Sequence, residues 1–365
     1  MMITILHAAD FHLDSAFGSL KENQAIQRRK ESRETVERVV DYGNDHGAKL
    51  RLLAGDLFDS DAVYAQTADE LAEALKTFRG EVVVAPGNHD YYSNSSPWKK
   101  KQWPENVHVL AKQEITLFDF PQLGCRVYGA AFTSAEKSRE LDFSDVELDP
   151  EIINIGLFHG DVGVRDSRYC PISIGAIKDS GLSYLALGHV HSFGGVEQAG
   201  KTYWAYPGCL EGRGFDETGE KGFLFGTVDK ESVILNFVPF AGHRYQILPV
   251  DISEKEPLEA IEDLLPPDVS QDIYRIVLTG ETAESSNTEA IYEQIKDRFF
   301  SVEVRDKTTI LHDIWEKQGD DSLKGLFLRE MRRRYDSAET EEERQKIVLA
   351  VRFGLNAMDN REMPG

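Results

Sequence analysis

The sequence predicts an α/β fold built on parallel strands, followed by a smaller α+β region and a helical tail. Through the first half of the 365-residue chain, short apolar runs alternate with longer amphipathic stretches. Such strand–helix–strand alternation is typical of a parallel sheet covered by helices. From about Ala241 the segments become shorter and mixed, and from about Ser322 the pattern is helical. We therefore expect three parts, which comprise residues 1–240, 241–310 and 311–365.

The strands and helices of the first part follow from hydrophobic patterning. Residues 20–45 are predicted to form a helix because Val36, Val39 and Val40 lie on one stripe of an otherwise polar segment. A second helix is expected from Thr67 to Phe78. Strands are predicted at ITILHAAD, LRLLAGD, EVVVAPGN, CRVYGAAF, IINIGLFHG and SYLALGH. Glycine-containing turns separate TYWAYPG, GFLFGTVD and SVILNFVPF, which indicates an antiparallel flank.

The remaining residues read as a small βαβ-like unit and two terminal helices. Strands are expected at YQILPVDIS, DIYRIVLTGE and SVEVRD, with helices at residues 257–265 and 288–299. The last two helices are LKGLFLREMRRRYDSA and TEEERQKIVLAVRFGLNAM. Thr340 and Glu343 have the spacing of a capping box at the start of the second.

Charge and cysteine content narrow the class of protein. The net charge of −22 argues against coating of nucleic acid by bulk electrostatics, although a nuclease with metal-binding carboxylates is still compatible with it. Three widely spaced cysteines without a CxxC motif favour neither a disulfide framework nor a cysteine zinc site. This usage predicts a cytoplasmic setting. No apolar run reaches the roughly 18 residues of a membrane span, and MMITILHAADFH reads as a first strand, not a signal peptide.

Five short polar segments each follow an apolar, strand-like run. They are Asp10-Phe11-His12, Gly55-Asp56-Leu57-Phe58-Asp59, Gly87-Asn88-His89-Asp90, His159-Gly160 and Gly188-His189-Val190-His191. The carboxyl ends of parallel strands share one edge of a sheet, so loops from different strands are expected to converge there. On extended backbone, residues two apart point to the same face, which would bring together the side chains of each D-x-H and H-x-H pair.

The residue types in these segments favour a pair of metal ions. Carboxylates, imidazoles and one amide oxygen suit manganese, iron or zinc, and the donors are too many for one tetrahedral ion. Two ions about 3.5–4 Å apart, bridged by a carboxylate, would use them all. The adjoining glycines let the backbone turn sharply and approach an ion. Taken alone, one histidine on an apolar run is more often a core residue and GNHD is compatible with a tight turn, but five strand ends together favour the site.

These ordered motifs, D-x-H, GD-x-x-D, GNH-D, H-G and GH-x-H, resemble those of the calcineurin-like metallophosphoesterases over about residues 1–240. The resemblance implies a β-sandwich flanked by helices, with residues 241–310 as an α+β capping domain and 311–365 as a helical tail. HAADFHLDSAF and YPGCLEGRGFDETGEKGF are similar to the SbcD-type DNA-repair nucleases, and closer still to their YhaO-like branch. Phosphatase branches of the superfamily often carry Arg at the position of Ser60. The serine therefore argues against those branches.

The resemblance also implies a role for each motif residue. By motif position, the metal ligands are Asp10, His12, Asp56 and His191 for the first ion, and Asn88, His159 and His189 for the second. Asp56 would bridge the two ions. His89 would hydrogen-bond the phosphate and protonate the leaving oxygen as a general acid, and Asp59 would orient His89. Manganese is the ion that the resemblance favours, with iron and zinc as alternatives.

Two regions suggest how such an enzyme would meet DNA and a partner. Tyr91, Lys99 and Lys100 lie in an aromatic and basic stretch after GNHD, where bases and phosphates could be bound; the alternative is an exposed loop with solvated lysines. Arg213 is either a phosphate contact or a structural residue near a turn. In SbcD-type nucleases the tail docks on the coiled coil of an SMC-like ATPase, SbcC-like or YhaN-like, and residues 311–365 have apolar helix faces that fit this role. Packing against the chain's own body is the alternative.

Three functions share this set of motifs. The first is a manganese-dependent DNA exonuclease, with endonuclease cleavage as a second mode, that works in DNA repair with the ATPase and forms a homodimer through helices of its phosphoesterase domain. The second is a phosphodiesterase or phosphatase for small nucleotides or other phosphoesters. The third is a docking subunit with structural metals, which Asp10, Asn88 and His89 argue against.

Overall fold

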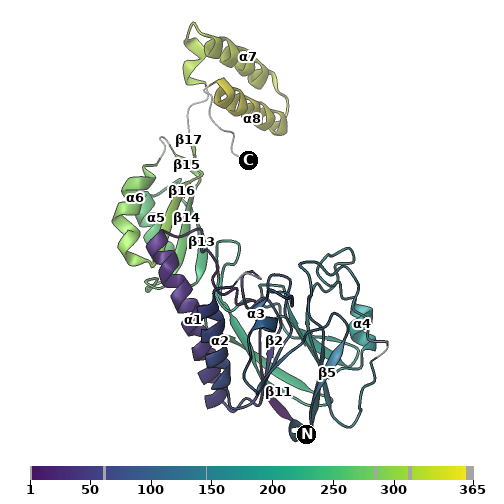
Figure 1. Ribbon diagram of the computed structural model, residues 1–365. Coiled ribbons are helices and arrows are strands. Elements are labelled where there is room, and N and C mark those ends of the chain that lie inside the picture. The colour runs from purple at the N-terminus through teal and green to yellow at the C-terminus, as the bar shows by residue number, and fades with distance from the viewer. Residues whose placement is uncertain (1, 61–62, 145, 283–285, 311–314, 359–365) are drawn as a thin grey trace. The chain divides into compact units, whose positions relative to one another are not determined.

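A computed structural model describes residues 2–60, 63–144, 146–282, 286–310 and 315–358 (Figure 1). The chain forms two compact units, residues 1–246 and 247–365. Each unit is described by itself below. The division of the later residues into a capping domain and a tail at position 310 stays a prediction.

The first unit is a sandwich of two six-stranded sheets, as the fold class predicted (Figure 1). In spatial order the first sheet contains β12 (Val233–Pro239), β11 (Gly222–Val228), β1 (Ile3–Ala8), β2 (Leu50–Leu53), β3 (Glu81–Val84) and β4 (Val107–Val109). The second sheet contains β5 (Thr116–Phe120), β6 (Cys125–Gly129), β7 (Ile153–His159), β8 (Tyr184–Gly188), β10 (Thr202–Ala205) and β9 (Glu197–Ala199).

Each sheet contains a run of parallel strands, with antiparallel pairing at one edge of the first sheet and at both edges of the second. Strands β1 to β4 pair in parallel, and so do β6, β7 and β8. The predicted antiparallel flank is confirmed for β11 and β12. It is wrong for TYWAYPG, because β10 pairs in parallel with β8 in the other sheet, with Tyr203 opposite Tyr184. The antiparallel partner of β10 is the short strand β9, with which it forms a hairpin.

Alternation along the strands builds a core on both faces of the first sheet. In β1, Ile3 and Ile5 pack between the two sheets, whereas Leu6 and Ala8 pack on the opposite face. The helices α1 (Glu22–Asp45) and α2 (Ala65–Lys76) cover that second face, and the predicted valine stripe of α1 belongs to this core. Burial of each such side chain stabilises the fold by about 1.5–3 kcal/mol. Shorter helices are α3 (Pro97–Lys100), η1 (Pro121–Leu123) and α4 (Ile174–Asp179).

The second unit begins with a three-stranded sheet in the order β13-β14-β16. Its elements are β13 (Tyr245–Asp251), α5 (Pro257–Leu264), β14 (Ile273–Thr279), β15 (Glu281–Thr282), α6 (Thr288–Ile295), η2 (Lys296–Arg298), β16 (Ser301–Asp306) and β17 (Thr309–Ile310). β14 and β16 pair in parallel around α6, which confirms the predicted βαβ-like unit. A core of its own, centred on Ile261 and Ile276, holds this sheet to its helices.

The last elements form a helical hairpin. They are η3 (Glu316–Gly319), α7 (Leu323–Ser337) and α8 (Glu341–Met358). Trp315, Leu328 and Val351 form the buried core of the hairpin. The predicted capping box is confirmed, because the Glu343 N–H donates to Thr340 Oγ1 at 3.2 Å and the Thr340 N–H donates to the Glu343 carboxylate at 3.4 Å.

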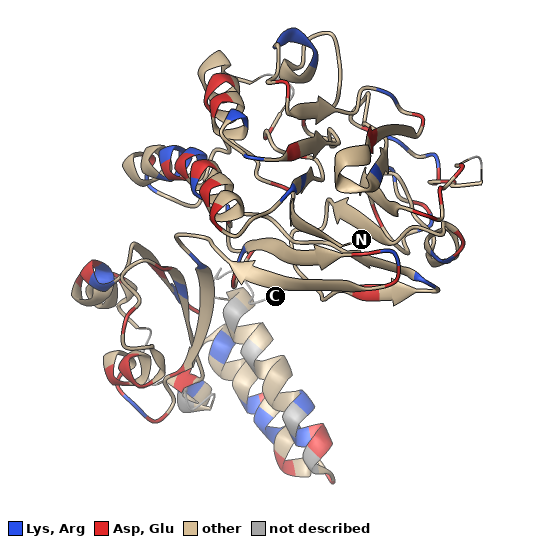
Figure 2. Cartoon of the chain, turned by 90° about the horizontal axis from the view of Figure 1, so that it is seen from below, with Lys and Arg blue, Asp and Glu red and all other residues tan. Residues whose placement is uncertain are grey.

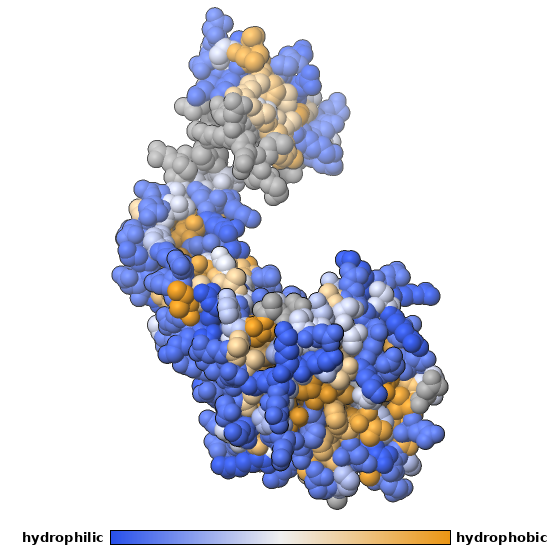
Figure 3. All heavy atoms as spheres, in the orientation of Figure 1, coloured by the Kyte–Doolittle hydropathy of each residue, from blue (hydrophilic) through white to orange (hydrophobic). Residues whose placement is uncertain are grey.

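The surface of the molecule mixes charges, and part of the hairpin surface is apolar. Figure 2 shows Lys and Arg interspersed with Asp and Glu along the helices. Figure 3 shows hydrophobic residues at the surface of the helical hairpin. The exposed large hydrophobic side chains of α7 and α8 are Leu323, Leu326, Leu349, Phe353 and Met358. None of the helices in the described part of the chain combines the length and hydrophobicity that a bilayer crossing requires.

Candidate metal centre

The predicted ligands come together at the carboxyl edge of the parallel strands. Asp10 and His12 follow β1, Asp56 follows β2 and Asn88 follows β3, while His159 ends β7 and His189 and His191 follow β8. Backbone hydrogen bonds join these strand ends. The Asp10 N–H donates to the Gly55 carbonyl at 3.0 Å, and the His12 N–H donates to the Asp56 carbonyl at 3.0 Å.

The backbone of these loops is strained, not extended. Asp10, His12, Asp56 and His189 have φ angles of 54°, 45°, 51° and 104°. The expectation that Asp10 and His12 share a face of an extended segment is therefore wrong in its geometry. β1 ends at Ala8, and the left-handed turns after it aim both side chains at the centre. Such conformations cost about 1–3 kcal/mol each and concentrate at functional sites.

Glycines permit the close approach of the loops. A Cβ atom on Gly87 would collide with the Asp56 carboxylate, and one on Gly188 would collide with the Ala54 carbonyl. A Cβ on Gly55 would lie 2.5 Å from Nδ1 of His159, and Gly55 also has a φ of +90°. The predicted need for glycine at these motif positions is confirmed, with lack of space as the main reason.

One group of donors surrounds the two histidines that were assigned to the first ion. The Nε2 atoms of His12 and His191 lie 3.3 Å apart. Oδ1 of Asp10 lies 3.8 Å from Nε2 of His191, and Oδ2 of Asp56 lies 3.8 Å from Nε2 of His12. All four are the ligands that the sequence assigned to one ion.

A second group lies around the amide of Asn88. Its Oδ1 lies 2.9 Å from Nε2 of His159 and 3.2 Å from Nδ1 of His189. Nε2 of His159 is also 3.4 Å from Oδ2 of Asp56. These three residues are the ligands assigned to the second ion.

Asp56 faces both groups, as a bridging ligand must. Its Oδ2 contacts His12 on one side and His159 on the other, while its Oδ1 accepts the His89 N–H at 2.8 Å. Burial alone would raise the pKa of Asp56, but the imidazoles of His159 and His12 outweigh burial and hold the pKa well below its usual range. The donor set of buried carboxylates, imidazoles and one amide oxygen fits a pair of divalent ions.

In three of the histidines, a hydrogen bond donated by Nδ1–H orients the ring so that Nε2 faces the metal centre. Nδ1–H of His12 donates to Oδ1 of Asp59 at 3.0 Å, and that of His191 donates to Oε1 of Glu217 at 2.6 Å. Nδ1–H of His159 donates to the Ala54 carbonyl at 2.8 Å. Such outer partners fix the tautomer, so that Nε2 carries the lone pair for a metal.

Glu217 and Asp161 are site residues that the sequence reasoning missed. Glu217 orients His191, and Asp161 lies 3.3 Å from Nε2 of His189, which therefore has Nδ1 available to the second group. The position of Asp161 two residues after His159, in a strand-end HGD, was the available signal. Glu217 lies in a loop where no periodicity points to it.

Asp59 and His89 meet differently from the expectation. The Asp59 carboxylate contacts His12, and Nδ1–H of His89 instead donates to the main-chain carbonyl of Asp59 at 3.0 Å. His89 is exposed, and its ring lies 4.8 Å from that of His12, centroid to centroid. Asp59 thus positions His89 through its backbone, because its side chain is engaged by His12. The catalytic roles of both residues stay predictions.

Asp90, the last residue of GNHD, holds the loops together. It is fully buried and accepts the N–H groups of Asp56, Leu57, Phe58 and Gly87. Burial and the charge of Asp56 raise its pKa to about 7. Asp90 therefore supports the loop that carries Asp56.

The pKa values of the two histidines in the second group are shifted in opposite directions. Burial opposes protonation of His159, but the Asp56 and Asp10 carboxylates outweigh it and raise its pKa to about 9. Burial and the nearby charge of His159 lower the pKa of His189 to about 4. A metal ion that binds His159 near neutral pH must therefore displace a proton.

The predicted substrate contacts after GNHD differ in their exposure to solvent. Lys99 and Lys100 are exposed on α3, and Nζ of Lys99 donates to Asn94, while Tyr91 is half-buried. Trp98 in the same stretch is buried and stacks on Trp103 with ring centroids 4.8 Å apart, so its ring belongs to the core. DNA contacts by Tyr91, Lys99 and Lys100 stay predictions.

Arg213 lies at the centre but faces carboxylates. Its guanidinium donates to Glu217 at 2.6 Å and to Oδ1 of Asp59 at 3.1 Å. These contacts favour the structural alternative that the sequence left open for this residue.

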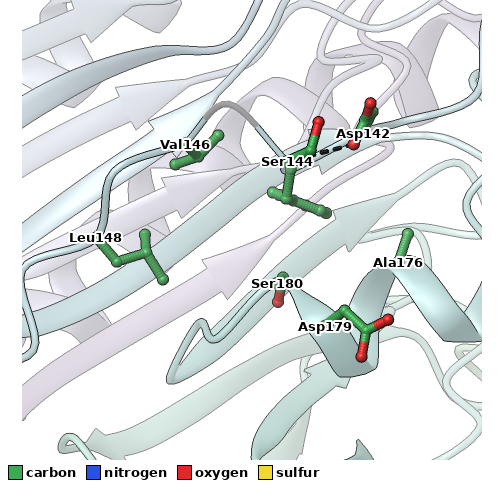
Figure 4. Close-up of a pocket in the computed structure, with 8 residues that line it drawn as sticks. Asp142, Ser144, Val146, Leu148, Ala176, Asp179 and Ser180 are labelled. Atoms are coloured by element: carbon green, nitrogen blue, oxygen red, sulfur yellow. Dashed lines mark hydrogen bonds between the residues drawn. The ribbon is translucent and has the colours of Figure 1, made fainter.

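A separate cavity of about 440 Å³ lies between the segments 142–144 and 146–148 and the residues at the end of α4 (Figure 4). Asp142, Asp179 and several apolar side chains line it, and none of its eight lining residues is a predicted metal ligand. The cavity is therefore distinct from the metal centre.

Comparison with known proteins identifies the family of this chain. The family described as calcineurin-like phosphoesterase matches residues 3–193. The uncharacterized metallophosphoesterase YhaO of Bacillus subtilis (strain 168) is 28% identical over 270 residues, 71% of this chain, and the match spans 65% of the relative's length. A dimetal phosphatase from Danio rerio is structurally similar with a TM-score of 0.39 and 12% identity, over 65% of this chain and 99% of that one. The chain belongs to the calcineurin-like phosphoesterase family of metal-dependent phosphoester hydrolases, which use a dinuclear metal site.

Proposed function

We propose that this chain is a two-metal DNA nuclease of the SbcD type that hydrolyses phosphodiester bonds in DNA repair. The observation that supports hydrolysis is the pair of metal-donor groups that share Asp56, with the exposed His89 beside them. Exonuclease action is the principal activity proposed, with endonuclease cleavage as a second mode. The motif resemblance to SbcD-type nucleases supports DNA as substrate.

In this proposal one set of residues binds the metal ions and His89 transfers the proton. Two divalent ions, manganese by preference, would when bound supply an activated water and offset the charge of the phosphate. Asp10, His12, Asp56 and His191 would hold one ion, and Asn88, His159 and His189 would complete the other. His89 donates a hydrogen bond to the phosphate and a proton to the leaving oxygen. Nδ1–H of His89 donates to the Asp59 carbonyl, so Nε2 is the nitrogen available for this transfer.

We also propose that residues 311–365 dock on an SMC-like coiled-coil ATPase. The supporting observation is the set of exposed apolar side chains on α7 and α8, which include Leu326 and Phe353. The cytoplasmic setting and the homodimer through helices of the phosphoesterase domain are part of the same proposal. Residues 311–314 and 359–365 lie outside the described part of the chain.

A small phosphoester is the second candidate substrate. It needs the same ligands, and two observations favour it: the net charge of −22, and the engagement of Arg213 by Asp59 and Glu217. Both reduce the positive potential that a long DNA backbone would meet.

The deciding experiment is cleavage of linear single- and double-stranded DNA with Mn²⁺, by the wild type and by His89→Ala, with an aryl phosphodiester in parallel. DNA degradation that is lost in His89→Ala while the metal content is unchanged supports the nuclease. Hydrolysis of the aryl ester alone, with DNA intact even after the ATPase is added, would contradict the nuclease proposal. The chain would then be a phosphodiesterase or phosphatase for small phosphoesters.

A further inference from the structure

The two histidines of the first donor group are oriented by carboxylates that share one arginine. Asp59 accepts Nδ1–H of His12, and Glu217 accepts Nδ1–H of His191. Arg213 donates from Nη1 to Asp59 at 3.1 Å and from Nη2 to Glu217 at 2.6 Å. One guanidinium therefore connects both outer partners of one pair of ligands.

This arrangement is well built on the Glu217 side. The Glu217 side chain is 5% exposed and also accepts the main-chain N–H of Arg213 at 2.8 Å and its Nε–H at 3.1 Å. The planar fork of arginine suits such paired contacts, which a lysine ammonium cannot reproduce. The positions of both carboxylates consequently depend on the same side chain.

The second donor group has no share in this arrangement. Nδ1–H of His159 donates to the main-chain carbonyl of Ala54, and His189 contacts Asp161, whose carboxylate accepts the Ser167 hydroxyl. Among these outer partners no contact with Arg213 occurs in the described residues. The two groups are thus oriented by independent structures.

We propose that Arg213 is a positioning residue that, through Asp59 and Glu217, sets the binding strength of the first metal ion and leaves that of the second unchanged. We call the contacts of Arg213 with Asp59 and Glu217 the clamp. Loss of the clamp frees the rings of His12 and His191, whose Nε2 atoms lie 3.3 Å apart. Outer partners of metal-binding histidines typically change metal affinity 10–100-fold. The inference rests on the metal centre of the proposed function and does not depend on the substrate.

The test is calorimetric titration of the metal-free full-length protein with Mn²⁺, with bound metal counted by mass spectrometry. Arg213→Ala, Arg213→Lys and Glu217→Ala are each expected to weaken one of two Mn²⁺ sites by about 10–100-fold. Asp161→Ala is the matched control and is expected to weaken the other site. The unfolding temperature of each metal-free variant shows whether the fold is kept, and Arg213→Lys serves if Arg213→Ala does not fold.

A double-mutant cycle identifies which site responds. Arg213→Lys is expected to weaken Mn²⁺ binding less in a His191→Ala background, where only its contact with Asp59 and His12 is still in place, and to have its full effect in a His189→Ala background. Folded Arg213 variants that bind both ions like the wild type, or that weaken both sites equally, overturn the proposal. If Mn²⁺ binding changes as expected but DNA is not cleaved by the wild type, the clamp stands and the nuclease proposal fails.

Discussion

Nε2 of His12 and Nε2 of His191 lie 3.3 Å apart, although 179 residues separate the two histidines along the chain. His12 follows β1 of one sheet, and His191 follows β8 of the other. The sandwich therefore places the carboxyl ends of both parallel segments at one edge, and the metal centre lies where they meet.

Substitution of His89 should separate chemistry from metal binding. His89→Ala removes the proposed proton donor, while the His89 main-chain N–H that supports Asp56 is kept. We expect kcat to fall by about 10²–10⁴-fold, the usual contribution of general acid–base catalysis, with two metal ions still bound. Steady-state kinetics together with metal analysis check this. Loss of metal from the variant would instead place His89 among the ligands.

Substitution of Gly87 should damage the bridging position without removing a ligand. A Cβ atom in Gly87→Ala would collide with the Asp56 carboxylate and its main-chain nitrogen. We expect lower metal stoichiometry and loss of most activity. Gly194→Ala is the matched control, because a Cβ there meets no heavy atom within 4 Å. Normal metal content in Gly87→Ala would show that the GNHD loop can move away from Asp56.

The buried histidine His7 should make stability depend on pH. Its Nε2–H donates to the Leu187 carbonyl at 3.1 Å and its Nδ1 accepts the Tyr184 hydroxyl at 2.8 Å, and burial lowers its pKa to about 3. The unfolded chain binds a proton at this residue below about pH 6.5, whereas the folded chain does not. The stabilisation is therefore present above pH 6.5 and is lost as pH falls toward 3.

Urea unfolding of the wild type and His7→Gln at pH 7 and pH 5 measures this term. Between these values the wild type is expected to lose about 2 kcal/mol more of its free energy of unfolding than His7→Gln. Equal losses in the two proteins would show that His7 is protonated in the folded state.

The exposed apolar face of the hairpin should be needed for the proposed ATPase and not for hydrolysis. Leu326 and Phe353 are 59% and 40% exposed. Leu326→Glu combined with Phe353→Glu is expected to abolish co-purification with the coiled-coil ATPase and to leave aryl-ester turnover unchanged. Leu264→Glu on α5, where the leucine is 52% exposed, is the control. Retention of the ATPase by the hairpin variant would contradict docking at this face.

Hydrophobic period and motif order were enough to predict the α/β class, the central strands and the long helices. β1, α1, β7 and the capped helix α8 follow from local patterns, because alternation, stripes and caps are properties of neighbouring residues. Short edge strands such as β4 and β9 escaped prediction because three residues carry too little periodicity. The place of β10 could not be predicted either, since strand pairing depends on distant partners.

The seven predicted ligands could be named from the sequence itself, because donor types at successive strand ends, and their likeness to a family's motifs, are visible in the order of residues. Only the tertiary structure decided how they are held. Glu217, Asp161 and Arg213 reach their partners across long stretches of chain, and the Asp59 carboxylate turns to His12 instead of His89. The physical reason is that ligand chemistry belongs to single side chains, whereas orientation depends on which carboxylate the folded backbone brings within hydrogen-bonding distance of which ring nitrogen.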